Sequence, residues 1–140
     1  MGTVTGSDLL AQSLKQQGLD TLFFLMGGPM LEAEAALVKL GLRMIDTRHE
    51  QAAARAAHAY ARLTRRPAGA MGCSGPGTTN LATDVAYAFV DAAPLIAVEG
   101  SSPRIQLRME ALGVDSITPV LSHGAPRRPA ASGRFPAGAR

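Results

Sequence analysis

The sequence lacks tryptophan altogether and has one cysteine, Cys73, in 140 residues. A single cysteine excludes an internal disulfide framework and is typical of a reducing compartment, so we expect a cytoplasmic location. Aromatic residues make up only 4% of the chain. Small side chains, above all alanine and glycine, must therefore do much of the packing, which favours close approach between helices and backbone.

Long apolar runs are also missing. No run approaches the ~20 residues that a membrane-spanning helix needs, and the N-terminal stretch MGTVTGSDLL has no signal-peptide core. We therefore expect no membrane partner. Acidic residues are absent after Asp115, and the segment that follows carries four arginines, at positions 127, 128, 134 and 140. Because the net charge of +3 is concentrated there, it does not indicate a nucleic-acid-binding face, and we expect no nucleic-acid partner.

The C-terminal segment differs in composition from the rest of the chain. From about Ser116 it is rich in proline, arginine, alanine and glycine and shows neither helical nor strand periodicity. Such a segment cannot bury enough apolar surface to order itself. We predict one folded domain over residues 1–115 and a disordered tail over residues 116–140. The patternless composition of the tail favours an out-of-frame or truncated product.

Before the tail, apolar runs alternate with helical patterns. The sequence predicts strands at residues 21–25, 42–47, 68–74 and 94–100, and helices at residues 7–17, 30–40, 51–63 and 78–90. Either Thr5 or Ser7 can cap the first helix. The strands are continuous apolar runs, which is typical of a parallel sheet covered by helices on both faces. We predict this α/β fold, incomplete at its C-terminal end.

Polar and glycine-rich segments follow each predicted strand: MGGP, TRHE, CSGPGTTN and EGSS. In a parallel sheet these segments lie along one carboxyl edge, where open α/β sheets bind ligands. Glu50 lies on this edge, where a strand ends and a helix begins. Taken alone, however, a glutamate at this position can simply complement the helix dipole.

The segment GPGTTN, residues 75–80, has the general form of a phosphate-binding loop. It is neither a P-loop nor a GxGxxG dinucleotide fingerprint. By itself it can equally be a strand-to-helix turn in which Thr78 or Thr79 caps the helix.

The remaining candidates for chemistry have ordinary structural interpretations. We expect Cys73 to lie in a strand interior and His58 to be a structural residue of a helix. The three histidines at positions 49, 58 and 123 show no metal-ligand spacing, so we expect no metal site.

The order of three segments is more specific than any one of them. RHEQ, then SGPGTTN, then DAAPLIAVEGS resembles the N-terminal pyrimidine-binding domain of thiamine diphosphate-dependent enzymes of the acetolactate synthase-like family. The resemblance extends from about Thr5 to Arg108. It implies thiamine diphosphate as cofactor.

The resemblance also implies roles for particular residues. Glu50 matches the catalytic glutamate that contacts N1′ of the cofactor's aminopyrimidine and promotes formation of the C2 ylid. Gly28, Pro76, Gly77 and Asn80 match cofactor-binding positions. Magnesium is expected only through the family's diphosphate-binding domain, whose Gly-Asp-Gly…Asn motif does not occur in these 140 residues.

In function, the resemblance implies a lyase or transferase that makes or breaks C–C bonds of 2-oxo acids or related carbonyl substrates. We expect the chain to be catalytically incomplete alone and the complete enzyme to be a homodimer or larger homo-oligomer. Two alternatives remain open at this point. The chain can be a subunit of a split enzyme that needs a diphosphate-domain partner, or a non-catalytic oligomerisation or binding module.

The composition of the tail leads to a test by limited proteolysis. We expect proteases to remove residues 116–140 quickly and to leave a resistant core, because a segment without a packed face exposes its backbone. Mass spectrometry of the digest identifies the end of the core. Protection of the chain up to Arg140 would contradict the prediction.

Overall fold

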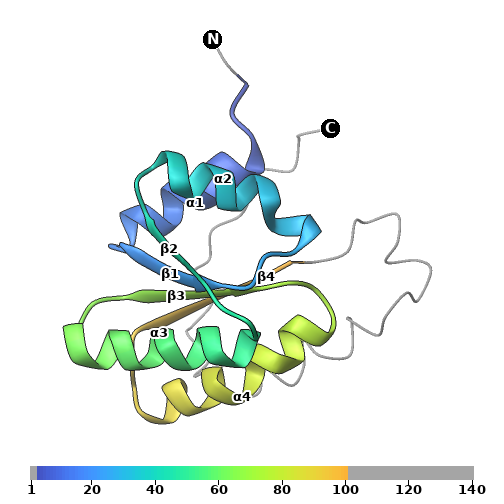
Figure 1. Cartoon of the computed structure of the whole chain (residues 1–140). Coiled ribbons are helices and arrows are strands. Elements are labelled where there is room, and N and C mark those ends of the chain that lie inside the picture. The colour runs from blue at the N-terminus through green and yellow to red at the C-terminus, as the bar shows by residue number, and fades with distance from the viewer. Residues whose placement is uncertain (1–2, 101–140) are drawn as a thin grey trace, which may run out of the picture.

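The computed structural model describes residues 3–100, and its centre is a four-stranded sheet with the strand order β2-β1-β3-β4 (Figure 1). All three pairs of neighbouring strands are parallel. The strands are β1 (Thr21–Phe24), β2 (Arg43–Asp46), β3 (Ala68–Gly72) and β4 (Leu95–Glu99).

Helices cover both faces of this sheet, as Figure 1 shows. One layer contains α1 (Gly6–Gln16), the 3₁₀ turn η1 (Gly28–Met30) and α2 (Leu31–Lys39). The other layer contains α3 (Glu50–Thr64) and α4 (Pro76–Val90). The predicted α/β fold, a parallel sheet between two helical layers, is confirmed.

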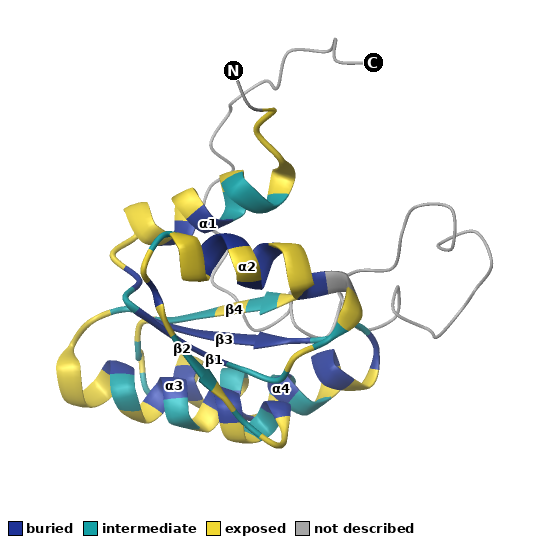
Figure 2. Cartoon of the chain, turned by 45° about the horizontal axis from the view of Figure 1, so that its top comes forward, coloured by how far each residue is buried: buried dark blue, intermediate teal, exposed yellow. Residues whose placement is uncertain are grey.

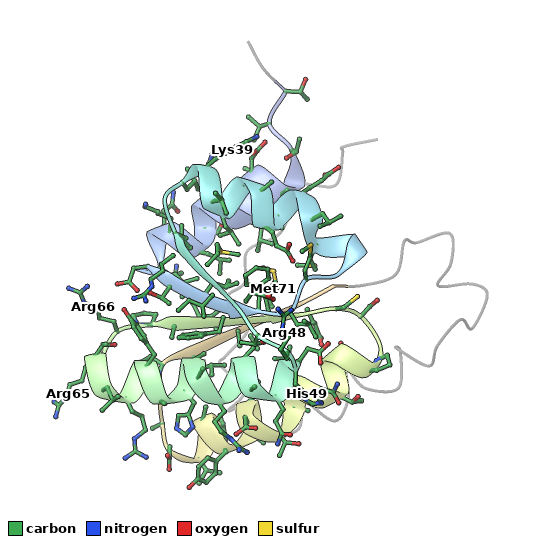
Figure 3. The ribbon with its side chains drawn as sticks, viewed as in Figure 1. Lys39, Arg48, His49, Arg65, Arg66 and Met71 are labelled. Atoms are coloured by element: carbon green, nitrogen blue, oxygen red, sulfur yellow. The ribbon has the colours of Figure 1, made fainter. Side chains whose placement is uncertain are left out.

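The side-chain alternation of the strands separates two cores of different character. On β1, Leu22 joins the cluster under α1 and α2, whereas Phe23 joins the cluster under α3. The first cluster is made mainly of leucine and methionine, including Met71 of β3, which lies between the sheet and the upper helices (Figure 3). The second is made mainly of alanine, and the buried alanines of α3 are Ala53, Ala54, Ala57 and Ala61. Because these side chains are small, α3 packs closely against the sheet, and its buried face is visible in Figure 2.

The start of α1 distinguishes between the two caps that the sequence allows. Thr5 is the N-cap: the Asp8 backbone N–H donates to its hydroxyl at 3.1 Å, and the Thr5 backbone N–H donates to the Asp8 carboxylate at 2.9 Å. This reciprocal capping box satisfies two backbone donors that the first turn leaves free. Ser7 therefore lies inside the helix.

The structure rejects one of the alternatives left open by the sequence, the threonine cap of α4, and shows that the prediction for Cys73 was wrong. Neither Thr78 nor Thr79 caps α4, which begins at Pro76 with Gly75 as its N-cap. Gly75 has a φ of 72°, which glycine adopts at little cost, and Pro76 supplies a helical φ at the first position. Cys73 does not lie in a strand interior, because β3 ends one residue earlier, at Gly72.

The strand order creates a switch point at the carboxyl edge. The chain leaves β1 through α2 to reach β2, on one side of β1, and then returns through α3 to β3, on the other side. The connections after β1 and after β3 therefore run on opposite faces of the sheet. In open α/β sheets a crevice forms at such a point, and ligands bind there.

Some sequence-based expectations fall outside the described part of the chain. They concern the tail over residues 116–140 and the last part of the predicted domain over residues 1–115. Within residues 3–100, none of the helices combines the length and the apolar character required to cross a bilayer.

The central position of β1 leads to a stability test. Leu22 is fully buried, at 0% exposure, whereas Leu63 at the end of α3 is 86% exposed. We expect Leu22→Ala to lower the free energy of unfolding by about 2–5 kcal/mol, through lost burial and the cavity left behind. Leu63→Ala is the control and should change it by less than about 0.5 kcal/mol. Urea denaturation followed by circular dichroism measures both, and equal effects of the two changes would show that the described core is wrong.

Candidate functional site

Glu50 is the first residue of α3, and the loop before it is fixed to the sheet. The backbone N–H and the hydroxyl of Thr47 both donate to the carbonyl oxygen of Phe24, at 2.7 and 3.0 Å. His49 then caps the helix, because its Nδ1 accepts the Gln51 backbone N–H at 3.2 Å. Figure 3 shows His49 at this end of α3. These contacts place Glu50 at the carboxyl edge in a defined position.

Glu50 is only 8% exposed. Asn80, from the second turn of α4, donates its side-chain amide to Oε2 of Glu50 at 2.9 Å. Two glycines leave the space for the rest of the carboxylate. A Cβ atom at Gly77 would lie 2.9 Å from Oε1 of Glu50, and one at Gly72 would lie 3.0 Å from its Cγ. Glu50 is therefore held by one amide and enclosed by backbone.

The loop after β1 closes the other side of this region. A Cβ atom at Gly27 would lie 2.6 Å from Cβ and 2.7 Å from Sγ of Cys73, so no other residue fits at position 27 without a shift. The Leu25 backbone N–H also donates to the Met71 carbonyl oxygen at 3.3 Å. The segments MGGP and CSGPG therefore lie against each other at the switch point.

Of the five residues assigned to the site from the sequence, the structure brings three into direct contact: Glu50, Gly77 and Asn80. Gly28 lies on the facing loop, where a Cβ atom would meet nothing within 4 Å. Pro76 is exposed at the first position of α4. The surroundings of Gly28 and Pro76 are thus accessible to a ligand.

Sequence reasoning missed the ion pair that joins α3 to α4 next to the site. The Nε of Arg55 donates to Oδ1 of the buried Asp84 at 3.0 Å. Asp84 follows Asn80 by four residues, so both lie on the same face of α4. A signal for this arrangement was present, because Asp84 interrupts the row of small or apolar residues formed by Gly77, Leu81 and Ala88.

The histidines have structural environments in this fold. His58 is buried between α3 and α4, with its Nε2 3.1 Å from Oδ2 of Asp91 and its ring edge-on to Tyr87. This agrees with the structural role expected for His58. Within residues 3–100, no group of three or more histidine, cysteine, aspartate or glutamate side chains is arranged to hold a metal ion. His123 lies outside the described residues.

Comparison with known protein families identifies the family of this domain. The model of the thiamine pyrophosphate enzyme N-terminal TPP binding domain matches residues 4–120. The chain belongs to this family. The resemblance drawn from RHEQ, SGPGTTN and DAAPLIAVEGS is therefore confirmed, and the buried Glu50 occupies a site in a thiamine pyrophosphate-binding domain.

Relatives of this TPP-binding domain include acetolactate synthases from plants and bacteria. Acetolactate synthase 3 of Brassica napus chloroplasts is 38% identical over 107 residues, which cover 76% of the chain and 16% of that protein. The acetolactate synthase large subunit of Mycobacterium tuberculosis is 38% identical over 110 residues, 79% of the chain and 20% of that protein. The chain thus spans about a fifth or less of the length of these relatives.

The contact between Gly77 and Glu50 leads to a test of the site geometry. We expect Gly77→Ala to displace the Glu50 carboxylate and to break its hydrogen bond with Asn80, because the added methyl group would overlap Oε1. The fold should persist, since alanine has the higher helix propensity, by about 1 kcal/mol. The nuclear magnetic resonance shifts of the Asn80 side-chain amide report the change. Gly28→Ala, which adds a methyl group in open space, is the control, and an unchanged Asn80 amide in Gly77→Ala would reject this geometry.

Proposed function

We propose that the chain binds the aminopyrimidine part of thiamine diphosphate and that Glu50 is the catalytic residue that exchanges a proton with it. One observation carries the proposal. Glu50 is a buried carboxylate at the sheet switch point, with a single amide donor, Asn80, on Oε2. A glutamate that only complemented a helix dipole would gain the same stabilisation while exposed to solvent.

The residues around Glu50 fit a planar, nitrogen-containing ring. Asn80 orients the carboxylate by donating to Oε2, which leaves Oε1 to interact with a ring nitrogen. Gly77 and Gly72 keep this region free of side-chain atoms, so the backbone of the SGPG segment can approach a ligand closely. Gly28 and Pro76 are proposed to line the same space from the adjacent loops.

In the proposed chemistry, the Glu50 carboxyl group carries the proton that is exchanged with the cofactor. When bound, thiamine diphosphate supplies an acidic carbon and an electron sink for carbonyl substrates. The contribution of the chain is to hold and release a proton at the carboxyl group of Glu50, a residue that is only 8% exposed. A positioned acid–base group of this kind contributes typically 10²- to 10⁴-fold to a rate.

For the complete protein we propose C–C bond formation or cleavage on 2-oxo acids or related carbonyl substrates, as a transferase or lyase. The relatives' names support this reaction class, since they are acetolactate synthases. Magnesium and the diphosphate group would be held by a separate diphosphate-binding domain. We also propose a homodimer or a larger homo-oligomer in the complete enzyme. Exposed apolar side chains near the end of α4 support an interface there: Tyr87, Phe89 and Val90.

The test uses a chimera that joins this domain to the remaining domains of an acetolactate synthase. We expect Glu50→Gln to slow proton exchange at C2 of the bound cofactor by roughly 10²-fold or more, because glutamine cannot transfer the proton. Glutamine keeps an acceptor for the Asn80 amide, so stability and cofactor binding should change little. Deuterium exchange followed by quenched-flow nuclear magnetic resonance measures the rate.

Glu32→Gln is the matched control, because Glu32 is an exposed glutamate in the first turn of another helix, α2. It should leave the exchange rate unchanged. If Glu50→Gln binds the cofactor and exchanges within a factor of two of the unmodified chimera, the catalytic role of Glu50 is rejected.

A further inference from the structure

Besides Glu50, two acidic residues are buried in the described part of the chain, Glu34 and Asp84. Oε1 of Glu34 has no hydrogen-bond partner among the described residues. Both carboxylate oxygens of Asp84, by contrast, accept from Arg55, whose Nε lies 3.0 Å from Oδ1 and whose Nη2 lies 3.4 Å from Oδ2. The proposed function does not use this two-point ion pair.

The ion pair lies one turn beyond the Glu50–Asn80 contact and joins the same two helices. Asp84 follows Asn80 by four residues on α4, and Arg55 follows Glu50 by five residues on α3. At a rise of 1.5 Å per residue, these steps are roughly 6–8 Å along the helix axes. The helices α3 and α4, which lie side by side in Figure 1, are therefore joined at two successive levels.

The faces that α3 and α4 bury consist largely of small side chains. Ala53, Ala54 and Ala57 of α3 belong with Leu81 of α4 to one core cluster. Methyl groups form shallow ridges, so they bring helices close but constrain the axial shift between them only weakly. A two-point arginine–carboxylate pair adds the missing geometric constraint, because both groups are planar and their contacts are directional.

The two partners differ in exposure, and this difference determines what loss of the pair would do. The Asp84 side chain is 5% exposed, whereas the Arg55 side chain is 69% exposed. A buried carboxylate that loses its counter-ion is strongly unfavourable, so α4 would have to shift or turn to bring Asp84 into contact with water. Asn80 lies on the same face of α4 one turn earlier, so this movement would carry its amide away from Glu50.

We propose that Arg55 and Asp84 are positioning residues, which hold α4 against α3 in the register that lets the Asn80 amide reach Glu50. The effect of the pair on proton exchange with the cofactor rests on the proposed function. Its effect on the contact between Asn80 and Glu50 does not.

The chain contains a matched control pair seven residues further along both helices. Arg62 of α3 forms an ion pair with Asp91, the C-cap of α4. The same residue types thus join the same two helices, but two turns, or about 10 Å, farther from the site. A merely structural role predicts that the two arginines behave alike, whereas a positioning role predicts that only Arg55 affects Asn80.

The first experiment measures solvent exchange of the Asn80 side-chain amide in the full chain, by saturation transfer in nuclear magnetic resonance. We expect Arg55→Gln to speed this exchange by roughly 2- to 10-fold, the range for loss of one hydrogen bond. Arg62→Gln should leave the rate unchanged. Equal exchange rates in the two variants would overturn the proposal.

A second variant removes the pair without leaving a charge unpaired. Arg55→Met together with Asp84→Leu replaces both partners by apolar side chains, and such replacements are often neutral or stabilising. The double variant should therefore fold even where Arg55→Gln does not. Fast exchange of the Asn80 amide in this stably folded chain would show that the pair acts on geometry and not on stability. A normal exchange rate there would reject the positioning role.

The third measurement tests, in the chimera described above, whether the pair acts through Asn80. Arg55→Gln should slow proton exchange at C2 of the bound cofactor by roughly 2- to 10-fold, and Arg62→Gln should not slow it. In an Asn80→Ala background, Arg55→Gln should cause no further slowing, because its effect requires the amide. If the two effects multiply in full, the pair does not act through Asn80 and the proposal is wrong.

The two proposals can fail separately. Normal C2 exchange in Glu50→Gln rejects the proposed function, but the Asn80 amide measurement needs no cofactor and still decides the positioning role. Equal Asn80 exchange in Arg55→Gln and Arg62→Gln rejects the positioning role alone, since Glu50→Gln can still slow C2 exchange.

Discussion

The close approach of α3 and α4 over the end of β3 is the constraint on which the site depends. The Asn80 amide donates to Oε2 of Glu50 at 2.9 Å, and glycine at position 77, the second residue of α4, leaves the space that Oε1 occupies. Alanines along α3 allow the same closeness further down the helix, and the Arg55–Asp84 ion pair joins the helices one turn beyond the site. Because small side chains take the place of aromatic ones here, the two helices come close enough to bury the Glu50 carboxylate.

The two faces of the sheet differ in function: one contributes mainly to stability, and the other forms the candidate site. Leucine and methionine side chains fill the space under α1 and α2, where the burial of large apolar groups contributes most per residue. The opposite face buries mainly alanine, so it gains less per residue but brings backbone and polar groups closer together. Glu34 is the exception on the first face, since it is an ionisable residue that is buried where apolar side chains are the rule.

The fold was predictable because continuous apolar strands separated by helices leave few alternatives to a parallel sheet, and such a sheet places Glu50 at the carboxyl edge. The start of α4 could not be predicted, because a positive φ at Gly75 depends on the path of the chain and not on composition. The contacts of Glu50 with Asn80 and of Gly27 with Cys73 join residues far apart in sequence and depend on strand order. Glu34 could not be distinguished from Glu32, because both are glutamates in one helical turn and only three-dimensional packing separates them.

The Glu50–Asn80 pair joins segments that are 30 residues apart in the chain, and β3 runs between them. A peptide spanning RHEQ and α3 would carry the carboxylate without its amide partner, and a peptide spanning α4 would carry the amide without the carboxylate. The recognition element is therefore not portable as a linear motif. Transfer of this site to another scaffold would require a parallel strand at the position of β3, two helices that start at its end, and glycine where they meet.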